Sequence, residues 1–156
     1  MRTSTRVAAL ATLTVATSVL AQNSPVAWWK FNEVGGLSAL DSGTLGVDGV
    51  LHGACGFTAG ISGNAISIPG AIGDFVNMGN VLPMVGTSFS MQAWMRTTNA
   101  TSANTISVGK HNAGTFNGYM MRLNYDGQYG LAQRAQFYQS NSPANTAVGT
   151  SIVTDG

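Results

Sequence analysis

The residues best suited to binding chemistry are polar and aromatic side chains that recur at every second position in three stretches. They are Trp94 and Arg96, then Arg122 and Asn124, and finally Arg134, Gln136 and Tyr138. Aromatic rings cover the apolar faces of sugars, and planar guanidinium and amide groups bond to their hydroxyls. If the three stretches are neighbouring strands, these residues form one ligand-binding face. The alternative is that Trp94 packs beneath a covering segment while the arginines form a solvated face.

The sequence predicts no catalytic residues. Glycan hydrolysis needs two carboxylates flanking the scissile bond, and no predicted strand carries two acidic residues; Glu33, the only glutamate, ends the first one. No serine occupies a nucleophile elbow, and His52 and His111 lie in Gly-rich turns. Cys55, the only cysteine, is interpreted as a small buried residue.

The elements that would position these side chains are predicted as short β-strands, because apolar residues recur with a period of two. The predicted strands are 26–31, 49–54, 64–68, 74–78, 89–95, 105–110, 119–125, 131–139 and 151–154. Asp126-Gly127 predicts a two-residue hairpin turn. No stretch keeps a helical period for three turns. The sequence therefore predicts an all-β antiparallel sandwich.

The first 21 residues are typical of a secretory signal peptide. Arg2 and Arg6 precede an uncharged stretch from Val7 to Leu20, which ends at Ala21. The expected mature chain, 22–156, keeps five of the seven basic residues and all six acidic ones. It lacks the basic stripe that nucleic acid requires, and no later segment is long and apolar enough to span a bilayer.

Three stretches resemble, in order, the laminin G-like members of the concanavalin A-like lectin and glucanase family. They are "VAWWKFNEVGGLSALDSGTLGVDGVLHG", "GISGNAISIPGAIGDFVNMGN" and "TSFSMQAWMRT". The resemblance covers residues 26–156 and implies an antiparallel jelly roll. In the family, the segment like "SIVTDG" is followed by a Trp-His strand and several more. Residues 22–156 are therefore expected to form a partial laminin G-like domain, cut at a turn.

The resemblance also implies a structural calcium ion, because calcium is the usual ion of this family. Asp41 and Asp74 stand where relatives keep acidic residues. The alternative for Asp41 is an Asx-type turn closed by its own side chain, and Asp74 could likewise only fix a hairpin. Pentraxin relatives place an Asp-Asn pair where this chain has Phe116-Asn117, so that part of their calcium site is missing here.

The expected function is that of a secreted or cell-surface recognition module without catalytic activity. Its expected partners are glycans or extracellular surface proteins, and it is expected to be a fragment of a larger exported protein. One alternative is the accessory part of an extracellular glycan-degrading enzyme whose catalytic portion lies elsewhere. Another is a purely structural adhesive domain. Loops are expected to set the ligand specificity in this fold.

Overall fold

The computed structural model describes residues 24–83, 88–97, 107–112, 117–124, 134–139 and 146–152, the last residue of two strands (Asn124 and Ile152) by its backbone alone. The predicted signal peptide (1–21) and the predicted turn at Asp126-Gly127 lie outside these ranges.

The described chain is all-β, as predicted. Its strands are β1 (Ser38–Ala39), β2 (Gly49–His52), β3 (Gly56–Ala59), β4 (Asn64–Ser67), β5 (Phe75–Asn77), β6 (Ser107–Asn112), β7 (Asn117–Asn124), β8 (Arg134–Gln139) and β9 (Thr146–Ile152). Within the described ranges there is no helix, and hence none that is long and apolar enough to cross a membrane.

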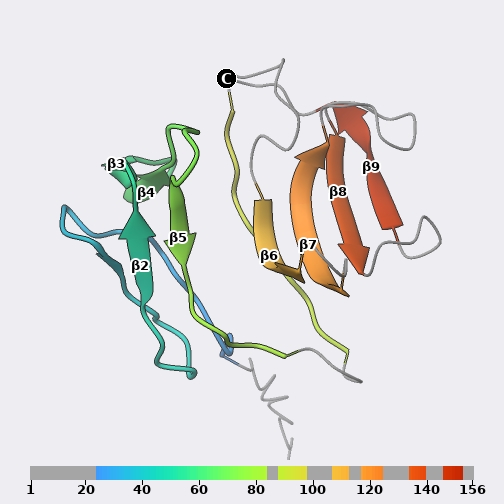
Figure 1. The fold of residues 1–156 in the computed structure, drawn as a ribbon, viewed down its shortest axis with the longest axis horizontal. Coiled ribbons are helices and arrows are strands. Elements are labelled where there is room, and N and C mark those ends of the chain that lie inside the picture. Colours follow the sequence, from blue (N-terminus) through green and yellow to red (C-terminus); the bar gives the residue numbers. More distant parts are fainter. Residues whose placement is uncertain are drawn as a thin grey trace, which may run out of the picture.

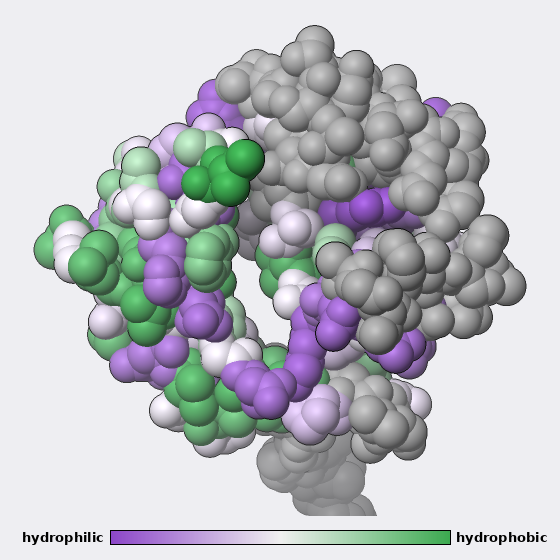
Figure 2. Space-filling view, in the orientation of Figure 1, coloured by the Kyte–Doolittle hydropathy of each residue, from purple (hydrophilic) through white to green (hydrophobic). Residues whose placement is uncertain are grey.

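The strands form three antiparallel sheets. Two small ones, with strand orders β1-β2-β5 and β3-β4, belong to the N-terminal half. The third has the order β6-β7-β8-β9, so each of its strands pairs with the next along the chain. In Figure 1 the small sheets lie on the left and the four-stranded sheet on the right. Figure 2 shows an opening between these two halves.

The N-terminal half has its own small core. Ala39, Leu51 and Cys55 are buried, with Leu51 only 4% exposed. Trp29, Phe31, Phe57, Ile66 and Val76 pack around them. Burying one side chain such as Leu51 contributes about 1.5–3 kcal/mol to stability. Period-two alternation explains the arrangement in β2, whose residues are alternately buried and exposed.

The four-stranded sheet packs one face against the preceding part of the chain. Tyr119 lies on this face. Its ring packs against that of Phe89, with the ring centroids 4.9 Å apart, and its hydroxyl donates to the Leu82 carbonyl at 3.0 Å. Phe137 contacts Phe89 as well, at 6.1 Å. Lys110 donates from Nζ to the Val81 carbonyl at 3.0 Å. These contacts join the sheet to Val81, Leu82 and Phe89 and leave its other face to the side chains that alternate with Tyr119 and Phe137.

Residues 26–31 do not form the predicted strand. The structure has only an isolated bridge between Trp29 and Asp41 there. The backbone of this segment bonds to the following turn instead, through Ser42 N–H to Trp28 O (2.8 Å) and Leu45 N–H to Val26 O (2.7 Å). Phe31 then takes a positive φ of 57°, which interrupts the extended backbone that a strand needs.

Residues 89–95 are not a strand either, although their alternation is the clearest in the chain. A strand exists only where a neighbour bonds to its backbone, and this segment joins no ladder among the described residues. The Phe89 side chain of this segment packs on the face of the four-stranded sheet that carries Tyr119 and Phe137. Alternation predicted which residues share a side, but it does not report whether a strand neighbour is available. Conversely, β1 and β3 were not predicted.

Candidate functional site

Asp41 holds a turn together with both oxygens of its carboxylate. Oδ1 accepts the N–H groups of Trp28 at 2.8 Å and Gly43 at 2.7 Å. Oδ2 accepts those of Gly46 at 2.9 Å and Val47 at 3.4 Å. The bond to Gly43, two residues on, is an Asx turn. The turn-closing alternative considered for Asp41 is therefore present in the structure.

The electrostatics of Asp41 reflect the same contacts. Desolvation raises the pKa of its carboxyl group, but the backbone N–H donors favour the ionised form and outweigh it, so the pKa lies below the ordinary value. Asp48 supports the turn from the other side, because its Oδ1 accepts the Asp41 N–H at 2.9 Å. The negative charge of Asp41 is thus stabilised by the loop that it organises.

Asp74 plays a comparable part in a second turn. Its Oδ1 accepts the Ala54 N–H at 2.8 Å, and its Oδ2 accepts the Ala71 N–H at 2.8 Å. These backbone bonds lower the pKa of Asp74 below the ordinary value. Ala54 follows β2 and Ala71 precedes β5. The carboxylate therefore connects the end of β2 with the segment that leads into β5, its partner strand.

The two carboxylates proposed for calcium therefore sit in separate turns and already accept backbone N–H groups with every oxygen. That geometry favours a turn-closing role, since calcium draws several carboxylate and carbonyl oxygens into one shell. In the ranges that the structure describes, no group of three His, Cys, Asp or Glu residues could hold a metal ion. Glu33 also bonds to backbone, accepting the Leu40 N–H at 2.8 Å on Oε1.

Three of the predicted ligand-binding residues do come together, on the four-stranded sheet. Arg122 of β7 lies opposite Gln136 of β8, and its Nε donates to Gln136 Oε1 at 2.7 Å. The Arg122 guanidinium also lies over the ring of Tyr138, 5.1 Å from its centroid. Gln136 is only 1% exposed and Tyr138 only 8% exposed. We call Arg122, Gln136 and Tyr138 the sheet cluster.

The sheet cluster has one unsatisfied donor at its centre. Gln136 Nε2 is buried and has no hydrogen-bond partner within the described structure. A buried amide nitrogen without an acceptor is unfavourable by about 1–3 kcal/mol.

His111 is a neighbour of the cluster that the sequence interpretation missed. Its ring meets Tyr138 edge-on, with the centroids 5.3 Å apart and the planes at 83°. The predicted strand stopped at residue 110, whereas β6 continues to Asn112. The alternation of Ser107, Gly109 and His111 was the available signal, because it continues through the predicted end of the strand.

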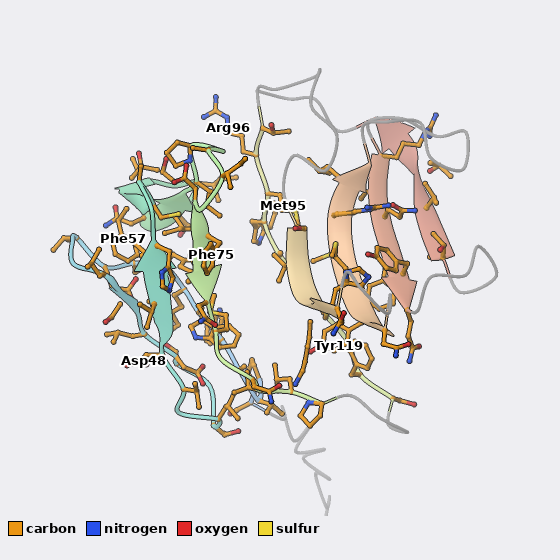
Figure 3. All side chains as sticks on the ribbon, in the orientation of Figure 1. Asp48, Phe57, Phe75, Met95, Arg96 and Tyr119 are labelled. Carbon is orange, nitrogen blue, oxygen red and sulfur yellow. The ribbon has the colours of Figure 1, made fainter. Side chains whose placement is uncertain are left out.

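Trp94 and Arg96 do not join the sheet cluster. Trp94 is 81% exposed, so it does not pack beneath a covering segment as the alternative for it supposed. In Figure 3 the Arg96 side chain points away from the four-stranded sheet. Phe89, from the same segment, packs on the opposite face of the sheet.

Arg134 lies on the same face as Gln136, two residues before it on β8. Its backbone partner on β7 is Asn124, one alternation beyond the pair of Arg122 and Gln136. The Arg134 side chain is half-buried. The register therefore extends the polar face toward the β7–β8 connection.

Comparisons with protein families, curated proteins and solved structures found no match to this chain.

Proposed function

We propose that this protein is a secreted, non-catalytic recognition module with a jelly-roll sandwich fold, and that it binds glycans on the sheet face that carries the half-buried Arg122 and Arg134. The observation that carries the proposal is the contact set of Arg122, Gln136 and Tyr138 on adjacent strands. The planar guanidinium of Arg122 matches the hydroxyls of a sugar, and the Gln136 amide and the Tyr138 ring hold it in place. Secretion rests on the leader-like residues 1–21.

Gln136 is the residue that best tests this role, because its side-chain amide accepts the hydrogen bond that orients Arg122. Replacing Gln136 by Leu removes the amide while keeping a side chain of similar size in a buried position. We expect the variant to lose about 10-fold or more in affinity for the glycan that the wild type binds, since a lost hydrogen bond to a charged or buried partner has this magnitude. Binding is measured on a glycan array and then by titration.

Gln139 supplies the matched control. It belongs to the same strand, lies at an exposed position, and faces away from the cluster, opposite Tyr119. Gln139→Leu is therefore expected to bind as the wild type does. A wild type that retains no glycan, or equal losses in both variants, would contradict the proposal.

A further inference from the structure

One short segment connects the N-terminal half of the chain with the four-stranded sheet. β5 ends at Asn77, whose Oδ1 accepts the Gly79 N–H at 2.8 Å in an Asx turn. The chain then reaches Val81 and Leu82, which bond to the sheet. Among the described strands, no sheet combines a strand of the first five with one of the last four, and the two groups lie apart in Figure 1. The orientation of the N-terminal half relative to the four-stranded sheet therefore depends on this connection.

Leu82 has a backbone conformation that L-amino acids rarely adopt. Its φ is 52°, in the left-handed region, where Cβ comes too close to the following carbonyl oxygen. Pro83 adds a second constraint, because a residue that precedes proline prefers an extended backbone. Both preferences favour a different conformation of Leu82. Contacts with the rest of the molecule must therefore hold it where it is.

Two side chains of the four-stranded sheet supply these contacts. Lys110 Nζ donates to the Val81 carbonyl at 3.0 Å, and the Tyr119 hydroxyl donates to the Leu82 carbonyl at 3.0 Å. Lys110 of β6 and Tyr119 of β7 are direct partners across the two strands. The two carbonyls lie on either side of the Leu82 N–Cα bond, about which φ turns, so the two donors together fix φ. We call Lys110 and Tyr119 the latch pair.

We propose that Leu82 is the pivot of a conformational latch that sets the orientation of the two halves. With both bonds of the latch pair in place, Leu82 stays in the left-handed region. When a bond breaks, Leu82 returns to the extended backbone, and the N-terminal half swings relative to the four-stranded sheet. Steric clashes exclude most φ values between the two conformations, so the latch has two discrete states. The opening between the halves in Figure 2 changes its width with the swing.

The test measures a distance between the two halves in the full chain. Spin labels are attached at Ile61→Cys, on the β3–β4 turn, and at Thr150→Cys, on β9, because both positions are exposed. Cys55, the only natural cysteine, is replaced by Ala in every sample. Pulsed electron paramagnetic resonance then gives the distribution of distances between the labels. With the latch pair intact, we expect one principal distance, that of the latched state.

Three variants should release the latch. Tyr119→Phe removes the hydroxyl but keeps the ring against Phe89, and Lys110→Met removes the donor but keeps an unbranched apolar stem. Each should raise the ratio of released to latched molecules about 3- to 10-fold, the effect of one hydrogen bond. Leu82→Val should act in the same direction, since a β-branched residue tolerates a positive φ poorly. Combined with Tyr119→Phe, it should make a second distance visible.

Leu82→Gly separates a latch from a general loosening of the protein. Glycine adopts a positive φ about as readily as a negative one, so this change should favour the latched state. Added to Tyr119→Phe, it should lower the ratio of released to latched molecules by at least about fivefold. A general loosening predicts the reverse, because glycine makes the chain more flexible. A broader distribution in this double variant than in Tyr119→Phe alone would therefore overturn the proposal.

Tyr138→Phe is the matched control. It also removes one tyrosine hydroxyl from the sheet, but from the face opposite to that of Tyr119, and the distance distribution should stay as in the parent chain. The same second distance in Tyr138→Phe would overturn the proposal, as would an unchanged distribution in the combination of Tyr119→Phe with Leu82→Val. Thermal melts identify variants that do not fold. If Tyr119→Phe is one of them, Lys110→Met with and without Leu82→Gly decides in the same way.

Discussion

Replacement of Asp41 by Ala should be the most destabilising change of an acidic residue in the N-terminal half. The Asp41 carboxylate accepts hydrogen bonds from four backbone N–H groups, and these bonds differ in length and in exposure to solvent. The bond to Gly43 is short and partly buried, whereas the bonds to Trp28 and Gly46 are exposed and the bond to Val47 is long. A charge-assisted bond at Gly43 contributes about 1.5 kcal/mol and the other three together about 1 kcal/mol. We expect a loss of about 2–3 kcal/mol.

Two further variants make the expectation quantitative. Asp41→Asn keeps one acceptor oxygen and should lose about half as much stability. Asp48→Ala removes one exposed bond, to the Asp41 N–H, and should change stability by less than about 1 kcal/mol. Urea unfolding followed by tryptophan fluorescence measures all three, because Trp28 and Trp29 adjoin the turn. A loss in Asp41→Ala no larger than that in Asp48→Ala would refute the reasoning.

The same variants test the calcium role that the family resemblance implied. If the turn is held by N–H bonds alone, millimolar calcium should leave the unfolding midpoint of the wild type unchanged. A ligand that binds only the folded state at about 100 times its dissociation constant would add about 2.7 kcal/mol. A calcium-dependent rise in the wild type that disappears in Asp41→Asn would instead establish Asp41 as a calcium ligand.

Three further outcomes are expected. The pKa values of Asp41 and Asp74 are lower in the folded protein than in the unfolded chain, where they are about 3.9. Their contribution to folding stability is therefore complete above that value and is lost as pH falls through the lower folded-state values. The melting temperature should stay constant from pH 7 to 5 and drop below about pH 4. Gly118→Ala should destabilise the protein by about 2 kcal/mol or more in urea unfolding, because Gly118 has a φ of 122° and a Cβ there would meet the backbone of β6; a wild-type midpoint would contradict this. Trp94→Ala should change the free energy of unfolding by less than about 0.5 kcal/mol, because Trp94 is 81% exposed. Phe89→Ala should lose about 2–3 kcal/mol, because Phe89 packs on the four-stranded sheet. The opposite order would mean that Trp94 is the packing residue.

Alternation in the sequence located most of the strands that carry the site. The predicted ranges 105–110, 119–125 and 131–139 overlap β6, β7 and β8, and short connections in such a series favour pairing of consecutive strands. The same alternation placed Arg122 and Gln136 on polar sides of their strands, and the register brings those sides together. Period two is a property of the extended backbone, so it is readable in strands that are long enough to show it, whereas the two residues of β1 are too few.

The burial of the sheet cluster could not be read in the same way. A glutamine on a polar side is expected in solvent, yet Gln136 is 1% exposed. Alternation tells which residues share a face, whereas burial depends on which segments cover that face. The two failed strand predictions have a related cause. Residues 26–31 bond to a turn that follows them, and residues 89–95 have no described ladder partner, so tertiary contacts decided both.

The carboxylates of the N-terminal half serve mainly to hold its turns. Every acidic residue in the described ranges accepts at least one backbone N–H, and Asp41 and Asp74 do so with both oxygens. Each carboxylate of the N-terminal half therefore helps to hold a backbone segment in place, although Glu33 Oε2 is buried without a hydrogen-bond partner. The sheet cluster presents the opposite chemistry, a guanidinium and an amide nitrogen beside an aromatic ring. The proposed glycan-binding function therefore rests on the donors of the four-stranded sheet and not on the carboxylates of the N-terminal half.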